Sequence, residues 1–473
     1  MSSPPPFRFP PSHRGPPRGP GQPSPFPSGR SNSTPADPAE AVRLTNDDAQ
    51  FSKLSAMRSG YFIDDYLPFF MQPLSGDAGP EAVISTAEGS ARIDPGCVHS
   101  RLTRPAFALR QVAYPDRRPP VINRGTYIRV RLFDWAVEAF LRQPGVGPGS
   151  LQVVSIGAGF DTRPFYLSAG ARENLRTYVE VDFPEVVARK MAAMQQADHF
   201  AQTQGLDLPF ASVYGPLHAS AADGDLPLSL TSEKYALVAA DAADTAALGR
   251  ALFDVARLDR HRPTLFLFEC VMVYIRPAAA DGLFAWLVAP DTGFSSVGML
   301  LFEMIGGGDH FGEMMVKNLK SRNIQLPGLL DDLGAHRARL QRAGFLQTPS
   351  RRTGFAGFNL HELFARVVSR AELRRLNTLE PLDEVEEWAL LMSHYVMYCG
   401  YSEAEAAGAK SATQQVAHPW EAFQQRCFAQ GCLESRSIDR AAADPALGPI
   451  PGGRLPDGGR TGGRLSFRAP SPP

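Results

Sequence analysis

Two short apolar runs, each ending at residues suited to ligand binding, constrain the fold of this chain more than any other feature. The first run, Leu151–Ile156, is rich in β-branched residues and leads directly into Gly157 and Gly159. A mostly apolar run of this length is typical of a parallel strand buried on both faces. The two glycines let the backbone turn sharply and approach a ligand without interference from side chains. The second run, residues 177–181, predicts a neighbouring strand that ends at Asp182.

The spacing between the glycines and Asp182 indicates the kind of ligand. Asp182 lies 25 residues after Gly157. In dinucleotide-binding sheets, a carboxylate about 20 residues past the glycine turn accepts hydrogen bonds from ribose hydroxyls. Thr162 stands where the third glycine of the nicotinamide pattern would be, and Asp161 suits a nucleoside cofactor without a pyrophosphate. The pattern therefore favours S-adenosylmethionine; the alternative is a strand-to-helix turn that binds nothing.

Charge and composition narrow the class of protein. The formal net charge of −1 disfavours a nucleic-acid partner, because nucleic-acid binders usually carry a strong basic excess. No run of 18 apolar residues is present, so no membrane partner is expected. The five cysteines are odd in number and scattered, with neither a disulfide framework nor zinc spacing, so no metal is expected. We therefore expect a protein of the reducing cytoplasm.

The sequence predicts one globular domain between two extensions. Residues 1–43 form a Pro-rich N-terminus, which should be disordered because it has too few apolar side chains to form a core. The globular domain is expected over residues 44–410 and begins with a helix that Gly60 ends. Residues 75–107 lack clear periodicity and predict an inserted surface loop. Residues 411–473 predict a C-terminal extension that is largely disordered.

Strands and helices alternate through the globular domain. Helical spacing is found over residues 124–142, and Pro184 is well placed to begin a helix that runs to about Gln202. Further strands are predicted at 235–239, 264–268 and 297–302. This alternation predicts an α/β fold with a doubly wound, mostly parallel sheet and an N-terminal helical lid. The carboxyl ends of these strands should line a single cleft, which would carry Asp182, Asp241, Glu269 and Glu303.

Several segments stand out along the chain: Asp47-Asp-Ala with Lys53 and Gly60-Tyr61, Ile122 to Arg129, Gly157 to Arg163, Glu180 to Pro184, Ala240-Asp241, Glu269 to Tyr274, Gly308 to Gly312 and Gln341 to Phe345. In this order, they resemble the leucine carboxyl methyltransferases, which methylate the C-terminal leucine carboxylate of the protein phosphatase 2A catalytic subunit. The resemblance covers about residues 45–400, apart from the loop at 75–107. It implies the Rossmann-like fold of class I methyltransferases, S-adenosylmethionine as the cofactor, the phosphatase tail as the partner and an effect on phosphatase holoenzyme assembly.

The resemblance implies roles for individual residues around the cofactor. Arg129 would bind the methionine carboxylate, which suits the planar fork of a guanidinium, and Lys53 would assist from the lid. Gly157 would lie against the cofactor, and Asp182 would hold its ribose. For Arg129 and Lys53, the alternative is an ordinary solvated position on a helix.

Other matched positions complete the implied site. Asp241 and Ala242 would flank the adenine, and Glu269 would lie near the methionine amine. Tyr274 is the candidate for the catalytic pocket, as part of its wall or as core. An α-carboxylate, with a pKa of about 3.3–3.7, is already ionised at neutral pH, so no general base is required.

Three alternative functions remain open. One is a tRNA wybutosine-type methyltransferase, although such enzymes carry a long C-terminal β-propeller and only about 70 residues follow Tyr401. A second is a small-molecule carboxyl or O-methyltransferase. A third is a non-catalytic phosphatase-binding scaffold, which would not need to keep Arg129 or Asp182. One departure from the family pattern is His310, where an arginine is frequent.

Overall fold

The fold is described from a computed structural model. It describes residues 37–71, residues 117–404 except 225 and 349, and residues 419–433. The inserted loop expected at 75–107 lies outside these residues, as do most of the expected N- and C-terminal extensions. Within the described residues, no helix is long and apolar enough to span a membrane.

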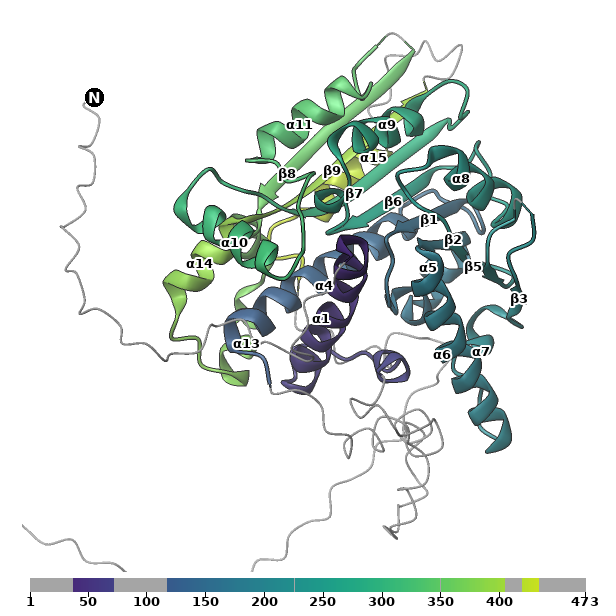
Figure 1. Ribbon diagram of the computed structural model, residues 1–473, viewed down its shortest axis with the longest axis horizontal. Coiled ribbons are helices and arrows are strands. Elements are labelled where there is room, and N and C mark those ends of the chain that lie inside the picture. Colours follow the sequence, from purple (N-terminus) through teal and green to yellow (C-terminus); the bar gives the residue numbers. More distant parts are fainter. Residues whose placement is uncertain (1–36, 72–116, 225, 349, 405–418, 434–473) are drawn as a thin grey trace, which may run out of the picture.

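A nine-stranded sheet crosses the described part of the molecule (Figure 1). Its strands are β1 (Leu151–Ile156), β2 (Leu175–Asp182), β3 (His218–Ser220), β4 (Ser229–Thr231), β5 (Tyr235–Ala239), β6 (Thr264–Glu269), β7 (Ser296–Met304), β8 (Arg351–Asn359) and β9 (Tyr395–Ala404). They stand in the order β3-β4-β5-β2-β1-β6-β7-β9-β8. The five predicted strands, β1, β2, β5, β6 and β7, are all parallel to their neighbours in this group, which confirms the α/β fold.

Antiparallel strands complete both edges of the sheet, and the sequence did not predict them. β9 pairs antiparallel with β7 and with β8. At the other edge, β4 pairs antiparallel with β5 and with β3. The sheet is therefore mixed, with a parallel centre.

Helices cover both faces of the sheet, as expected for alternating strands and helices. Successive strand residues point to opposite faces, so Val153 belongs to one hydrophobic core and Val154 to the other. The first core is covered by α1 (Pro38–Arg58), α4 (Pro120–Leu141), α5 (Ala169–Asn174), α6 (Pro184–Thr203), α7 (Ala211–Tyr214), α12 (Leu360–Val367), α13 (Arg370–Leu379), α14 (Val385–Ser393) and α15 (Pro419–Cys427). The second core is covered by α8 (Thr245–Gly249), the π-helix η5 (Arg250–Val255), α9 (Pro277–Val288) and α11 (Leu333–Arg342). Figure 1 shows α9 and α11 on one side of the sheet and α1, α4 and α6 on the other.

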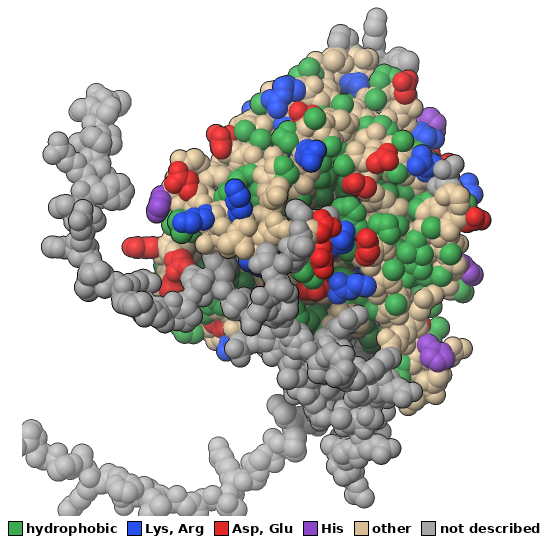
Figure 2. Space-filling view, in the orientation of Figure 1, with side chains coloured by type: hydrophobic (Ala, Val, Ile, Leu, Met, Phe, Trp, Pro, Cys, Tyr) green, Lys and Arg blue, Asp and Glu red, His purple; other side chains and the backbone are tan. Residues whose placement is uncertain are grey.

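The N-terminal helix α1 packs across α4 and forms the expected lid. It begins at Pro38, six residues before the expected domain boundary. Asp47 pairs with Arg189 of α6 at 3.0 Å. Asp48 pairs with Arg118, 3.6 Å away, and with Arg322, which follows α10 (His310–Ser321). Acidic and basic side chains accordingly lie side by side around α1 in Figure 2.

Part of the C-terminal extension, which was expected to be largely disordered, contributes to the core. In α15, the Trp420 side chain is only 2% exposed and stacks on Phe140 of α4, with ring centroids 5.2 Å apart. It also lies flat against Gly298 of β7, where a Cβ would approach the Trp420 ring to 2.0 Å. The short helix has only two large apolar residues, Trp420 and Phe423, and most of its other residues are polar, so its periodicity alone gives a weak signal.

Candidate active site

The turn after β1 contains the two glycines expected to approach a ligand. Both have left-handed backbone angles, with φ of 63° at Gly157 and 53° at Gly159. A Cβ at Gly157 would lie 2.7 Å from Cγ2 of Val271, and one at Gly159 would lie 2.7 Å from Oδ1 of Asn46. Glycine is therefore required twice over, by the backbone angle and by the space. The segment after β6 and the lid helix α1 both close on this turn.

Asp182 ends β2 directly beside the glycine turn. Its Oδ2 accepts a hydrogen bond from the Gly159 amide at 2.6 Å, and its Oδ1 accepts one from the Phe183 amide at 2.7 Å. Burial raises the pKa of Asp182, while these two amides oppose that shift. The carboxylate thus fixes the glycine turn against the second strand.

An interlocked group of ions lies at the same edge of the sheet; we call it the charge cluster. Arg129 of α4 pairs with Glu269 at the end of β6, with 2.5 Å between Nε and Oε1. Arg163 lies 3.5 Å from the other oxygen of Glu269 and pairs more closely, at 2.5 Å, with Asp161. Lys53 of α1 lies 3.8 Å from Asp161. The charge cluster therefore joins the lid, α4, the glycine turn and β6.

The charges in this cluster outweigh the effect of burial on Glu269. Burial alone would raise its pKa, but Arg129, Lys53 and Arg163 together lower it to about 2. The side chains of Lys53 and Glu269 are each 13% exposed, and that of Arg129 is 25% exposed. The ionised cluster is thus partly open to solvent, as a ligand site must be.

Two members of this network received no role from the sequence. Arg163, whose side chain is 1% exposed, bonds Asp161 and also Asp134 of α4, 3.2 Å from its Nε. Arg163 stands at the end of the segment from Gly157 that resembles the family, which was the available signal. Asp134 gave no signal, because an isolated acidic residue within a helix usually faces solvent.

Asp241 and Ala242 lie beside the site without joining the charge cluster. The preceding residue, Ala240, donates its amide to the backbone oxygen of Asp182 at 2.9 Å, so β5 ends next to β2. Asp241 is exposed, and its Oδ1 accepts a hydrogen bond from the Ala243 amide at 2.8 Å. Among the contacts of the described residues, none joins Asp241 to Glu269.

The turn after β6 holds the remaining two candidates. Tyr274 ends the short helix η6 (Met272–Tyr274), where burial raises the pKa of its phenol and its hydroxyl neighbours Thr45 of the lid. Glu303 differs from expectation, because β7 continues to Met304 and Glu303 is fully buried rather than placed at the open edge. Of the four carboxylates expected in one cleft, Asp182 and Glu269 lie in the candidate site, Asp241 lies beside it, and Glu303 is buried.

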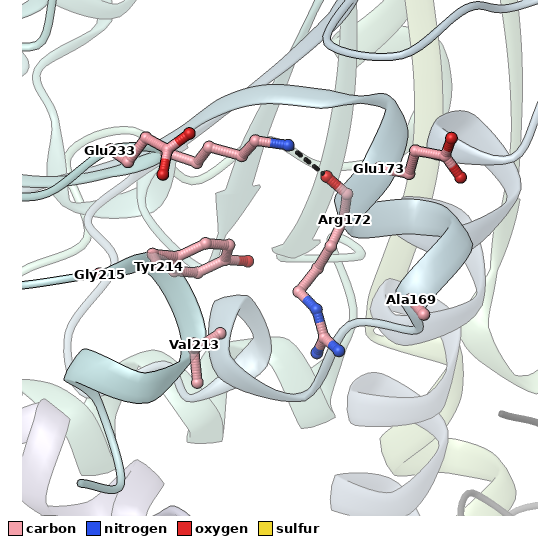
Figure 3. Close-up of a pocket in the computed structure, with 8 residues that line it drawn as sticks. Ala169, Arg172, Glu173, Val213, Tyr214, Gly215 and Glu233 are labelled. Carbon is pink, nitrogen blue, oxygen red and sulfur yellow. Dashed lines mark hydrogen bonds between the residues drawn. The ribbon is translucent and has the colours of Figure 1, made fainter. Parts of the chain in front are cut away.

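A separate cavity of about 310 Å3 lies at the opposite end of the sheet. Its walls are formed by α5, α7 and the residues before β5 (Figure 3). The Lys234 ammonium donates to the Arg172 backbone oxygen at 3.0 Å. These residues lie at the amino ends of β2 and β5, whereas ligands of such sheets bind at the carboxyl ends. We therefore place the candidate site at Asp182 and Glu269, and not in this cavity.

The donor and acceptor groups at the carboxyl edge fit S-adenosylmethionine. A carboxylate has about four acceptor positions, and backbone amides use only two at Asp182, which leaves positions for ribose hydroxyls. A guanidinium has five N–H donors, and Glu269 takes the Nε donor of Arg129, so a second carboxylate can be bound. Among the described residues, no group of three or more His, Cys, Asp or Glu could hold a metal ion.

Comparisons with known proteins agree with these features. The sequence pattern of the family described as "Leucine carboxyl methyltransferase" matches residues 43–288. Leucine carboxyl methyltransferase 1 of Cryptococcus neoformans is 31% identical over 375 residues, which cover 76% of this chain and 93% of that protein. The tRNA wybutosine-synthesizing protein 4 of Rattus norvegicus is 32% identical over 329 residues, which cover 69% of this chain. The match spans only 45% of that longer relative.

A search of solved structures also matched phospholethanolamine N-methyltransferase 2 of Haemonchus contortus, in complex with phosphomonomethylethanolamine and S-adenosylhomocysteine. It is 12% identical, covers 60% of each chain and has a TM-score of 0.28. The family match spans Arg129, the glycine turn, Asp182 and Glu269. The chain therefore belongs to the leucine carboxyl methyltransferase family of S-adenosylmethionine-dependent methyltransferases.

Proposed function

We propose that this protein methyl-esterifies the C-terminal leucine carboxylate of the protein phosphatase 2A catalytic subunit and thereby regulates assembly of the phosphatase holoenzyme. The observation that carries the proposal is the charge cluster, in which Arg129 and Glu269 form a close ion pair at the edge of the sheet. Such a pair suits a zwitterionic cofactor, and an acceptor that is already ionised requires no general base. A C-terminal carboxylate meets that requirement at neutral pH.

The extent of the sequence match supports this acceptor. The aligned region takes in 93% of the leucine carboxyl methyltransferase 1 of Cryptococcus neoformans and 90% of its homolog in Arabidopsis thaliana. Nearly every part of those two relatives thus has a counterpart in this chain. The tail of the phosphatase catalytic subunit is accordingly the proposed partner.

We assign the following roles within this proposal. Arg129, with Lys53, binds the methionine carboxylate of the cofactor, and Glu269 binds the amine. Gly157 provides the close backbone approach, and Asp182 accepts hydrogen bonds from the ribose. Asp241 and Ala242 flank the adenine, which is compatible with their position after β5 and beside β2. Tyr274 forms the wall of the acceptor pocket beneath the lid helix.

The reaction requires alignment more than acid–base chemistry. Bound S-adenosylmethionine supplies a methyl group on a positively charged sulfur. The protein's part is to orient the acceptor oxygen in line with that methyl group and to exclude the water that would otherwise solvate the carboxylate. Glu269 and Asp161 favour a positively charged ligand over a neutral one, which would promote exchange of the product for fresh cofactor.

The decisive experiment is mass spectrometry of the phosphatase C-terminal peptide after incubation with this protein and S-adenosylmethionine. We expect a gain of one methyl group on the intact phosphatase and none when its terminal leucine is removed. An unmodified peptide, under conditions where the protein binds the cofactor, would rule out this acceptor. The Arg129→Ala protein serves as the control for contaminating activity.

A second candidate is methylation of a modified tRNA nucleoside. It is favoured by the 32% identity to the tRNA wybutosine-synthesizing protein 4 of Rattus norvegicus. The same incubation with total tRNA, followed by nucleoside analysis, tests it directly. Transfer to tRNA without transfer to the phosphatase would reverse our assignment.

A further inference from the structure

The turn after β6 has a conformation that side chains rarely adopt. Cys270 has a φ of 59°, in the left-handed region, although it is not a glycine. Its amide donates to the Phe302 backbone oxygen at 2.7 Å. The next residue, Val271, fills the space over Gly157. A strained backbone of this kind persists only where the surrounding structure holds it in place.

Glu303 of β7 is the side chain that holds this turn. It is fully buried, and its Oε1 accepts hydrogen bonds from the amides of Val271 at 3.1 Å and Met272 at 2.9 Å. Its Oε2 makes no hydrogen bond within the described residues. Burying a carboxylate with one unsatisfied oxygen destabilises the folded protein, so its presence here indicates a role other than stability.

We propose that Glu303 is a positioning residue of the cofactor site. By binding the two amides after Cys270, it fixes the turn that presses Val271 against Gly157 and sets the course of the chain beyond Glu269. Its effect on cofactor binding is indirect, through the position of the turn. The proposal therefore depends on S-adenosylmethionine binding and not on which molecule accepts the methyl group.

The charged surroundings of Glu303 give this role a distinctive pH dependence. The titratable groups that face it are Arg129 of α4, Cys270 and Tyr274 after β6, and Tyr398 of β9. Burial raises the pKa of Glu303 to about 7, against the opposing effect of the amides. A positively charged ligand at this edge favours the ionised carboxylate. Binding of S-adenosylmethionine should therefore release a proton below about pH 7 and weaken as the pH falls.

The test is isothermal titration of the full-length protein with S-adenosylmethionine and with S-adenosylhomocysteine between about pH 6 and pH 8. For the unmodified protein we expect S-adenosylmethionine affinity to fall up to about tenfold from pH 8 to pH 6. The neutral sulfur of S-adenosylhomocysteine should give a smaller change. In Glu303→Gln, the amide oxygen still accepts both backbone bonds, so the turn remains and the additional pH dependence disappears.

Glu303→Ala removes both bonds and should weaken binding of the two ligands at least about tenfold at pH 8. Glu403→Gln is the matched control, because Glu403 lies on β9 opposite Ser296, at the far end of the same sheet. Thermal unfolding of the ligand-free variants gives a second readout. A lower unfolding temperature with unchanged affinity in Glu303→Ala would overturn the proposal. If that variant does not fold, Glu303→Gln decides alone, and an unchanged pH profile there would overturn it as well.

Discussion

Asp182 illustrates how a single carboxylate organises this site. It is 7% exposed, and both of its oxygens already accept a backbone amide, one of them from the glycine turn. The same side chain therefore holds the turn in shape and presents its remaining acceptor positions to a ligand. Removal of this side chain should therefore weaken ligand binding both directly and through the shape of the turn.

We predict that Asp182→Ala weakens S-adenosylmethionine binding about 10- to 100-fold, because the Gly159 amide loses its acceptor and the ribose loses a partner. Isothermal titration measures this directly. The matched control is Asp198→Ala, which also removes two backbone hydrogen bonds, to Phe210 and Ala211, but away from the site. Equal losses of affinity in both variants would mean that Asp182 acts only through general stability.

The low pKa of Glu269 predicts how stability changes in acid. An unfolded glutamate has a pKa of about 4.3, whereas the charge cluster holds that of Glu269 at about 2. The ionised form therefore stabilises the folded protein above about pH 4.3, and this contribution is lost as the pH falls towards 2. Glu269→Gln should lower the free energy of unfolding at neutral pH by about 3 kcal/mol and flatten its dependence on acid. Thermal unfolding measured as a function of pH tests this, with Glu313→Gln, at an exposed position, as the control. If Glu269→Gln kept the native dependence of stability on pH, as the control should, the prediction would be wrong.

Burial explains which residues of the site could not be predicted from the sequence. Asp182 and the glycines could be placed because strand, turn and carboxylate are ordered along the chain. Arg163 and Asp134 belong to the same ion network, but which helical or loop side chains turn inward depends on the tertiary fold. Glu303 was placed at the correct end of its strand, yet its burial beneath a turn could not be read from a one-dimensional pattern.

Helix α15, the last helix of the described residues, makes a close packing contact with β7. Trp420 covers Gly298 so closely that any side chain there must displace the ring.

The parallel strands were predictable because each is a compact apolar run. By contrast, β8 contains two glycines and is half-buried throughout, and α15 has few apolar residues, so neither has a strong pattern.

We predict that Gly298→Ala costs about 1–3 kcal/mol of unfolding free energy through overpacking, and that Trp420→Ala costs about 3–5 kcal/mol. The double variant should lose less than the sum, because the ring that clashes has been removed. Chemical denaturation measures all three. Gly282→Ala on α9 is the control, since its Cβ would enter open space and should stabilise the helix by up to about 1 kcal/mol. Strict additivity of the two core changes would disprove the contact.

For the whole molecule, the lid helix α1 is the element that bridges the two sides of the site. Its partners are spread over α6, the chain before α4 and the chain after α10, and the pairs of Asp47 and Asp48 with arginines are only partly buried. Partly exposed ion pairs are weakened by salt. The attachment of the lid should therefore depend on ionic strength, whereas the two hydrophobic cores should not.

We predict faster amide hydrogen exchange in α1 at about 1 M salt than at about 0.01 M, where the Debye length is roughly tenfold longer. Exchange in α9 should change less, because α9 packs mainly by apolar contacts and has one ion pair, between Asp281 and Arg339 of α11. Mass spectrometry of peptides from both helices measures the difference within one sample. A uniform response of α1 and α9 to salt would show that the lid is held by its apolar face instead.

The packing of Trp420 has a consequence for the synthesis of this protein on the ribosome. In the first core, the indole ring of Trp420 packs on Phe140 and Gly298. The helix that carries this ring is synthesised after every strand of the sheet. A nascent chain can complete the parallel strands early, yet it exposes an apolar hollow until α15 leaves the exit tunnel. That interval is when the growing polypeptide would most need protection by a chaperone.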